Sequence, residues 1–177
     1  MSETSAKHKS EAPKVLNFAV IICSTSRYEA FLKTGRYSDQ TGDLIVQLIK
    51  NNGHRVTMRR LISDNKREIQ HAVLRALRSR KTDIVVTSGG TGISTSDVTI
   101  EAVQPLLEKD LPGFGQLFHM ISYEKIGSPA LLTRAIAGVA FGKAVFCLPG
   151  SPQSVSLALE NLILPEAGHI LKHAREK

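Results

Sequence analysis

The segment from Val15 to Cys23 constrains the fold of this chain more than any other. Apart from Asn17 its residues are apolar, a pattern typical of a strand that is buried on both faces. Such a strand belongs at the centre of a sheet, because a strand with one exposed face alternates apolar and polar residues. A further strand is predicted from Asp83 to Thr87, where another apolar run occurs.

Helix-like segments alternate with these strands. Residues 39–52 repeat apolar side chains at helical spacing and stop at Gly53, and a second helix is predicted to open at Asp64. Two further helices are predicted near 99–109 and 114–125, and a final helix is predicted to start at Pro152 and to be kinked or split at Pro165. A further strand is predicted at 54–61, and an antiparallel hairpin is predicted from strands 131–139 and 143–148. The alternation predicts an α/β fold, a three-layer α/β/α sandwich with a mostly parallel sheet and one antiparallel edge strand.

Length and composition fit one such domain. Of 177 residues, 42% are apolar, which allows a substantial core without disulfides. We expect residues 1–13, which are polar and lack the apolar centre of a signal peptide, to be a flexible tail, and residues 14–177 to be a single domain. No apolar run approaches the roughly 20 residues of a membrane span, so we expect a cytoplasmic protein without membrane contact. Cys23 and Cys147 lie in apolar runs without a C-x-x-C motif, which favours buried free thiols.

The net charge of +7 indicates anionic partners. The chain has 23 Lys and Arg against 16 Asp and Glu, and the excess is diffuse except at Lys66-Arg67 and in the series Arg75, Arg78, Arg80 and Lys81. That series is either a solvated helix face or a surface that attracts nucleic acid or small phosphorylated substrates. Since the sequence contains no nucleic-acid-binding motif, nucleic acid is the less favoured partner.

Residues 87–99, Thr-Ser-Gly-Gly-Thr-Gly-Ile-Ser-Thr-Ser-Asp-Val-Thr, form the pattern of a strand end, a glycine loop and a helix start. The three glycines accept positive φ at little steric cost and carry no Cβ, so successive backbone N–H groups can converge on a phosphate. Asp97, just beyond them, can hold a magnesium ion on that phosphate. The alternative interpretation is a tight turn in which Asp97 or Ser96 caps the following helix.

Four loops leave predicted strands at their carboxyl ends, where open α/β sheets bind ligands. The candidate binding residues in three of them are Ser24 and Ser26 after the first strand, Ser88, Gly89, Gly90, Thr91 and Gly92 in the glycine loop, and Pro149, Gly150, Ser151 and Pro152 after the last strand. The fourth loop contributes Asp64, which is equally suited to cap the helix that follows. Likewise, the serines after the first strand can simply satisfy loop backbone, and Ser151 with Pro152 suits the start of a helix. Taken together, two carboxylates beside an anion-binding loop are what magnesium-assisted nucleotide chemistry requires.

Five ordered motifs give the chain a family resemblance. They are Ser-Gly-Gly-Thr-Gly at 88–92, Ser-Asp-Val-Thr at 96–99, Pro-Gly-Phe-Gly at 112–115, Thr-Arg-Ala-Ile-Ala-Gly-Val at 133–139 and Leu-Pro-Gly-Ser-Pro at 148–152. The set resembles the molybdopterin adenylyltransferase family of molybdenum cofactor biosynthesis over roughly residues 14–172. Residues 118–127, Phe-His-Met-Ile-Ser-Tyr-Glu-Lys-Ile-Gly, are most similar to its branch called molybdenum cofactor biosynthesis protein B.

The resemblance implies transfer of AMP from ATP to the terminal phosphate of molybdopterin, with release of pyrophosphate and a requirement for Mg²⁺. By the same resemblance, Asp64 and Asp97 match the catalytic, magnesium-associated aspartates of the family. The glycine loop and residues 149–152 match its nucleotide-phosphate and substrate loops. Members of the family form trimers, and in the B branch two trimers often associate into a hexamer. The resemblance therefore implies that this chain forms a homotrimer or a homohexamer.

The chain departs from the family pattern after the first strand. It has Cys-Ser-Thr-Ser-Arg where the family often has Ser-Asp-Arg or Ser-Asn-Arg, and Ala135 stands where some plant and animal relatives have a substrate-facing serine. Some bacterial members of the B branch resemble the enzyme without catalysing the reaction, but they lack the aspartate that matches Asp64. Because this chain keeps both aspartates, we favour an active adenylyltransferase over a silent molybdopterin-binding paralogue. A P-loop kinase is less favoured, since Gly92 is followed by Ile93 and Ser94 rather than by Lys and Ser or Thr.

Overall fold

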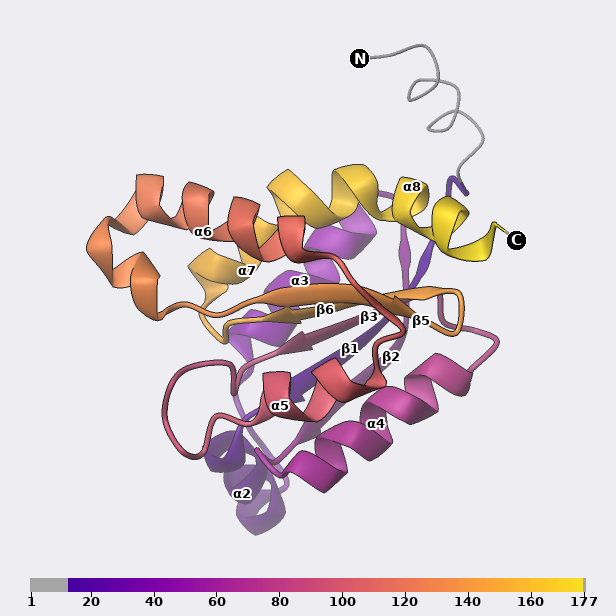
Figure 1. Cartoon of the computed structure of the whole chain (residues 1–177). Helices are drawn as coiled ribbons and strands as arrows, with labels where there is room; N and C mark the ends of the chain where they lie inside the picture. Colours follow the sequence, from indigo (N-terminus) through magenta and orange to yellow (C-terminus); the bar gives the residue numbers. More distant parts are fainter. Residues whose placement is uncertain (1–12, 177) are drawn as a thin grey trace.

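Six strands form one mixed sheet in the computed structural model, which describes residues 13–176 (Figure 1). The strand order is β2-β1-β3-β6-β5-β4. The first four of these strands run parallel to one another, whereas β5 is antiparallel to β6 and β4 is antiparallel to β5. The strands are β1 (Asn17–Cys23), β2 (Arg55–Ile62), β3 (Ile84–Ser88), β4 (Lys109–Asp110), β5 (Ile136–Ala140) and β6 (Lys143–Leu148).

Helices cover both faces of the sheet (Figure 1). On one face, α3, α6, α7 and α8 enclose one core cluster, and on the other face α4 and α5 enclose a second. The α-helices are α2 (Thr25–Thr34), α3 (Gln40–Asn51), α4 (Lys66–Arg78), α5 (Thr99–Val103), α6 (Pro112–Ile126), α7 (Pro152–Ala158) and α8 (Leu164–Arg175). Short 3₁₀ turns occupy Gln104–Leu106 and Ser128–Leu132, and a π turn at Leu159–Ile163 joins α7 to α8. The predicted three-layer α/β/α fold is confirmed.

The first strand has the central position that its composition predicts. Phe18, Val20 and Ile22 are at most 1% exposed and belong to the core on one face, while Ala19 and Ile21 are completely buried in the core on the other. Hydrogen-bonded neighbours flank β1 on both sides. An alternating polar side chain at any of these positions would place a polar group in one of the two cores.

Several predicted elements differ from those in the structure. The loop expected after the first strand is a helix, α2, which the sequence pattern does not reveal because none of its residues is buried. The helix predicted over 99–109 ends as α5 at Val103 and gives way to a 3₁₀ turn and to β4, so the antiparallel edge contains a short second strand. The strand predicted from Leu131 starts only at Ile136, because residues 128–132 form a 3₁₀ turn. The predicted break near Pro165 is present: the π turn precedes it and Pro165 lies in the first turn of α8.

The predicted tail, residues 1–13, lies outside the described residues except for Pro13. No helix between residues 13 and 176 is long and apolar enough to cross a bilayer. Cys23 and Cys147 are buried free thiols, as the sequence predicts, and burial raises the pKa of each to about 12. Both thiols are therefore protonated at neutral pH, and neither acts as a nucleophile.

Candidate functional site

The four predicted loops meet at one edge of the sheet. Since β2, β1, β3 and β6 are parallel, their carboxyl ends lie side by side, and each is followed by one of these loops. Hydrogen bonds connect the loops directly. Ser88 Oγ donates to Pro149 O at 3.0 Å, and Gly89 N donates to Leu148 O at 3.0 Å. The sequence-predicted residues are thus brought together at the carboxyl edge of the sheet.

Asp64 lies after β2 and is held by the start of α2. One carboxylate oxygen, Oδ2, accepts hydrogen bonds from Thr25 N at 2.7 Å and from Thr25 Oγ1 at 2.9 Å. In return, Thr25 Oγ1 accepts from Asp64 N at 3.0 Å. The other oxygen, Oδ1, is buried and has no hydrogen-bond partner among the described residues. A buried carboxylate oxygen without a partner is costly in free energy, so it marks a position that a ligand or metal ion can satisfy.

Asp64 does not cap α4. The N-cap residue is Asn65, whose side chain accepts from Arg67 N and Glu68 N, so the interpretation of Asp64 as a helix cap is wrong. Because Asn65 caps α4, the carboxylate of Asp64 has no capping role at this helix. Its carboxylate instead points toward the glycine loop.

The glycine loop adopts the conformation that its sequence predicts at two positions. Gly89 has φ of 100°, and a Cβ there would lie 2.2 Å from Cys23 O. Gly90 has φ of 62°, and a Cβ there would lie 2.7 Å from Asp64 Oδ1. Both positions therefore exclude any side chain, and the absence of one at Gly90 lets the loop backbone approach the unpartnered carboxylate oxygen.

Asp97 closes the other end of the same loop. Its Oδ2 accepts from Ser94 N at 3.0 Å, and a Cβ on Gly92 would lie 2.7 Å from that oxygen. The N-cap residue of α5 is Val98, without a side-chain capping bond, so the interpretation of Asp97 or Ser96 as the helix cap is wrong. Asp97 is half-buried and contacts the loop that begins beside Asp64.

Two further residues fix this loop, and the sequence reasoning assigned a role to neither. Thr99 Oγ1 donates to Gly89 O at 2.8 Å, and Thr99 N donates to Gly90 O at 2.9 Å. Arg134 Nε donates to Thr91 O at 2.8 Å, while its Nη1 pairs with Glu101 Oε1 at 2.8 Å. Both residues stand within motifs that carry the family resemblance, and that membership was the available signal.

The serines of the candidate site have structural partners. Ser24 is the N-cap of α2 and accepts from Arg27 N, and its Oγ lies 3.4 Å from that of Ser26. Ser151 is the N-cap of the final helical segment, with Pro152 in its first turn, as the sequence predicts. Gly150 O accepts from Thr41 Oγ1 at 2.9 Å, which ties α3 to this loop. These side chains hold the loop backbones in place at the edge of the sheet.

The donor set suits a magnesium ion that shares its coordination with a substrate. Within residues 13–176, no cluster of three or more His, Cys, Asp or Glu is arranged to hold a metal. Mg²⁺, however, characteristically binds through only one or two carboxylates together with waters and substrate phosphates. Asp64 and Asp97, whose carboxylates lie beside Gly90 and Gly92 of the glycine loop, could contribute oxygen ligands of that kind, and Asp64 Oδ1 has no hydrogen-bond partner among the described residues.

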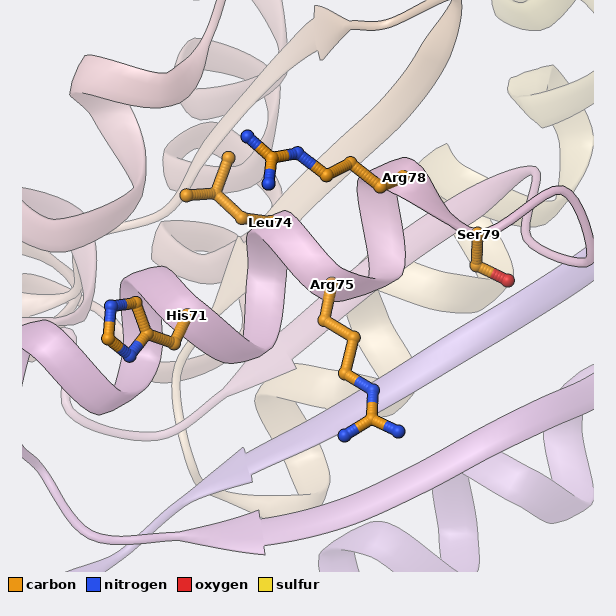
Figure 2. Close-up of a pocket in the computed structure, with 5 residues that line it drawn as sticks. All are labelled: His71, Leu74, Arg75, Arg78 and Ser79. Atoms are coloured by element: carbon orange, nitrogen blue, oxygen red, sulfur yellow. The ribbon is translucent and has the colours of Figure 1, made fainter.

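A basic surface begins beside this site and runs along α4. One hollow is lined by Tyr28, Arg60, Ile62, Glu68, His71, Ala72 and Arg75, and the hollow drawn in Figure 2 is lined by His71, Leu74, Arg75, Arg78 and Ser79. The two share His71 and Arg75, and Figure 2 shows the Arg75 and Arg78 side chains extending from the helix in different directions. Ser63 Oγ donates to Glu68 Oε2 at 2.8 Å, which joins this surface to the residue before Asp64. Across the part of the chain that the structure describes, Arg60, Arg75 and Arg78 form no ion pair, so the surface is positively charged.

The fold and the four loops that meet at one edge of the sheet define an α/β domain with a candidate ligand site at the carboxyl ends of its parallel strands. A family model described as "Probable molybdopterin binding domain" matches residues 19–169, and the chain belongs to this family.

Relatives and solved structures of the family agree over nearly the whole chain. The chain is 47% identical to molybdenum cofactor biosynthesis protein B of Bacillus cereus, over 93% of its own length and 94% of that protein. It is 42% identical to the molybdopterin adenylyltransferase of Pyrococcus furiosus, over 96% of its length and 98% of that protein. A crystal structure of molybdenum cofactor biosynthesis protein B superposes with a TM-score of 0.86 at 45% identity, covering 94% of this chain and 100% of the other. The tungsten cofactor synthesizing protein MoaB from Pyrococcus furiosus superposes with a TM-score of 0.83 at 40% identity, covering 93% of this chain and 100% of the other.

Proposed function

We propose that the chain is a molybdopterin adenylyltransferase, and that residues 14–177 act as one domain. The observation that carries the proposal is the buried Oδ1 of Asp64, which lies against the glycine loop and has no hydrogen-bond partner in the described part of the chain. It is supported by the 42% identity to a protein named for this activity. In the reaction, an oxygen of the terminal phosphate of molybdopterin bonds to the α-phosphorus of ATP. The bond from that phosphorus to the bridging oxygen of the β-phosphate breaks, and pyrophosphate leaves with the electron pair.

The residues of the site perform the tasks that this reaction demands. The attacking phosphate is already ionised near neutral pH, so no general base is required. The main obstacle is repulsion between two polyanions, which backbone N–H groups of residues 88–92 offset by offering partial positive charge. Asp64 and Asp97 would hold Mg²⁺, which when bound neutralises phosphate charge and orients the reacting groups. The loop at residues 149–152 borders the same edge and contributes to substrate binding.

The basic surface along α4 supports the same assignment. Within residues 13–176 the guanidinium groups of Arg60, Arg75 and Arg78 form no ion pair, and they line two hollows along α4. A field of one sign near a binding site raises the local concentration of oppositely charged substrate and accelerates its association. ATP and molybdopterin are both anions, so this surface draws them toward the carboxyl edge of the sheet.

We also propose that the protein works as a homotrimer or homohexamer in the cytoplasm. An apolar surface on α6 and the adjoining 3₁₀ turn supports the assembly; its members, 47% to 85% exposed, are Leu117, Met120, Tyr123, Ile126, Leu131 and Leu132. A monomer would leave these apolar side chains in water, which favours burial against another copy. The buried free thiols fit a reducing compartment.

Incubation of the purified protein with ATP, Mg²⁺ and molybdopterin tests the assignment, with mass detection of adenylylated molybdopterin. We expect the product together with stoichiometric pyrophosphate. Binding of molybdopterin without product, with any divalent metal, would identify a silent molybdopterin-binding protein instead. Salt-sensitive binding of DNA or RNA with no affinity for molybdopterin would indicate a nucleic-acid-binding module.

A further inference from the structure

Two histidines on α8 face each other through their ring nitrogens. His169 and His173 are one helical turn apart, and their Nε2 atoms are separated by 3.0 Å. Each ring is held from behind by a carboxylate: His169 Nδ1 lies 3.2 Å from Glu166 Oε2, and His173 Nδ1 lies 2.8 Å from Glu176 Oε2. The ring centroids are 4.8 Å apart and the planes are tilted by 56°. Two oriented imidazoles thus converge on one point.

The carboxylates determine which nitrogen of each ring carries the proton. An ionised carboxylate only accepts hydrogen bonds, so Nδ1 of each histidine is the donor. In a neutral imidazole with Nδ1 protonated, Nε2 presents a lone pair. Two lone pairs directed at each other across 3.0 Å repel unless a positive charge stands between them. The pair is therefore built to share a cation, either a proton or a metal ion.

We propose that His169 and His173 bind one late first-row divalent metal ion through their Nε2 atoms. Two nitrogens at 2.0 to 2.1 Å from one ion lie about 2.9 Å apart at a 90° angle and about 3.4 Å apart at the tetrahedral angle. The observed 3.0 Å matches the right-angled geometry of Ni²⁺ and Cu²⁺ most closely. Carboxylates behind ligating histidines are the usual means of fixing the tautomer and raising ligand basicity, and both are present here.

The proposed metal site on α8 differs from the candidate magnesium site in its position and in the type of its ligand atoms. The same end of α8 is joined to the sheet through Arg175, which pairs with Asp83 immediately before β3, at the amino end of that strand. The glycine loop lies at the opposite, carboxyl end. Imidazole nitrogens select Zn²⁺, Cu²⁺ and Ni²⁺ over Mg²⁺, whereas the two aspartates offer oxygen only. With no third protein ligand among residues 13–176, water or another molecule completes the coordination.

Binding here has two measurable consequences. The ion replaces any proton shared by the pair, so binding releases protons and weakens as pH falls. It also joins two positions of the last turns of α8 that are not held together in the unfolded chain, so it raises the melting temperature in proportion to the logarithm of metal concentration. Neither consequence depends on adenylyl transfer.

The test is calorimetric titration of the full-length protein, without an added histidine tag, with Ni²⁺ as the probe. We expect saturable binding of one ion per chain, at least tenfold weaker in His169→Ala and in His173→Ala, and unaffected by excess Mg²⁺. Glu176→Gln keeps the metal ligands but removes a supporting carboxylate, and we expect about tenfold weaker binding from it. His71→Ala, an exposed histidine on α4, is the matched control and should bind as the wild type does.

Two further measurements distinguish metal binding by His169 and His173 from a purely structural role of these residues. The observed enthalpy should vary with the ionisation enthalpy of the buffer in the wild type, as proton release requires. Ni²⁺ should raise the melting temperature of the wild type and of His71→Ala but not of the two α8 variants. Equal Ni²⁺ affinity in the wild type and both α8 variants, or no binding at millimolar Ni²⁺ in a folded wild type, would overturn the proposal.

Discussion

Thr25 donates two hydrogen bonds to a single oxygen of Asp64, one from its backbone nitrogen at 2.7 Å and one from its hydroxyl at 2.9 Å. The second oxygen is buried and has no hydrogen-bond partner within residues 13–176. Thr25 thereby orients the carboxylate, fixing one oxygen so that the other is directed at Gly90. Thr25 belongs to the segment Cys-Ser-Thr-Ser-Arg, where the chain departs from the family pattern, and the structure shows that this residue holds the carboxylate of Asp64.

Thr25→Val should slow adenylyl transfer because it removes the hydroxyl while preserving side-chain shape. The backbone bond to Asp64 remains, so we expect a loss of about fivefold in kcat, or about 1 kcal/mol of transition-state stabilisation. Thr25→Ser retains the hydroxyl and should restore nearly full activity at an unchanged KM for ATP. Equal kcat in the Val and Ser variants would show that the hydroxyl does not position Asp64.

Asp64→Asn and Asp97→Asn should show whether the two aspartates act through their negative charge, because each substitution removes the charge and preserves the shape of the side chain. In each variant the amide oxygen can still accept the bonds donated by Thr25 or Ser94, and neither residue caps a helix. Removing the charge from an unpartnered buried oxygen relieves a desolvation cost, so the melting temperature should stay constant or rise slightly. Adenylyl transfer should fall at least tenfold, a loss of about 1.4 kcal/mol, because the magnesium ion is held less firmly.

Molybdopterin binding is the control for both aspartate variants. It should remain largely intact, since the backbone cradle is unchanged. Wild-type turnover in both variants would refute the site assignment. A large drop in melting temperature with a proportional loss of activity would instead assign the carboxylates a structural role.

Much of the fold could be predicted because its central strands, β1 and β3, are buried on both faces. The continuous apolar character of β1 and β3 fixes them as central strands, and the placement of their loops at one edge follows from parallel pairing. What the pattern missed are elements with few buried side chains. α2 has none, and β4 consists of the exposed pair Lys109 and Asp110, so neither leaves a hydrophobic period in the sequence.

For the candidate site, Asp64 and Asp97 could be predicted from the sequence, but the residues that hold the glycine loop in place could not. Asp64 was ambiguous because a helix cap and a ligand-facing carboxylate occupy the same strand-to-helix turn; only the side chain of Asn65 decides between them. The bonds from Thr99 and Arg134 to the glycine loop join residues that are 10 and 43 positions apart in the chain. Such contacts follow from the packing of α5 and β5 beside the loop, which periodicity does not encode.

Gly89→Ala should destabilise the protein severely. The substitution combines a φ of 100° with a Cβ that would lie 2.2 Å from Cys23 O, a backbone atom of the central strand that cannot move freely. We expect a loss of about 3 kcal/mol or more in the free energy of unfolding. Gly113→Ala, where a Cβ in α6 meets nothing within 4 Å, is the control and should be neutral or slightly stabilising. Comparable melting temperatures for the two variants would contradict the tight approach of Gly89 to β1.

The apolar surface on α6 should be covered by another copy of the chain. Light scattering at micromolar concentration should give a mass well above the 19.3 kDa of one chain. Paired substitution of the exposed residues Met120 and Tyr123 by Lys should shift the mass toward that of the monomer, because buried like charges oppose association. Phe31→Lys, an exposed aromatic residue on α2, serves as the control and should leave the mass unchanged. A monomeric wild type would refute the assembly.

The pair of Asp83 and Arg175 should make stability depend on pH in a defined direction. Partial burial of Asp83 raises the pKa of its carboxyl, but hydrogen bonds from Arg175 and Asn17 outweigh it, and the net pKa is lowered. A carboxyl whose pKa is lower in the folded state contributes stability that is fully present above its unfolded pKa of about 3.9. That contribution is lost as pH falls through the folded pKa. Asp83→Asn should therefore lower the free energy of unfolding by about 1 to 3 kcal/mol at pH 7, and the difference from the wild type in urea titrations should shrink steadily below about pH 4. A difference that stays constant down to pH 2 would show that the charge of Asp83 does not stabilise the fold.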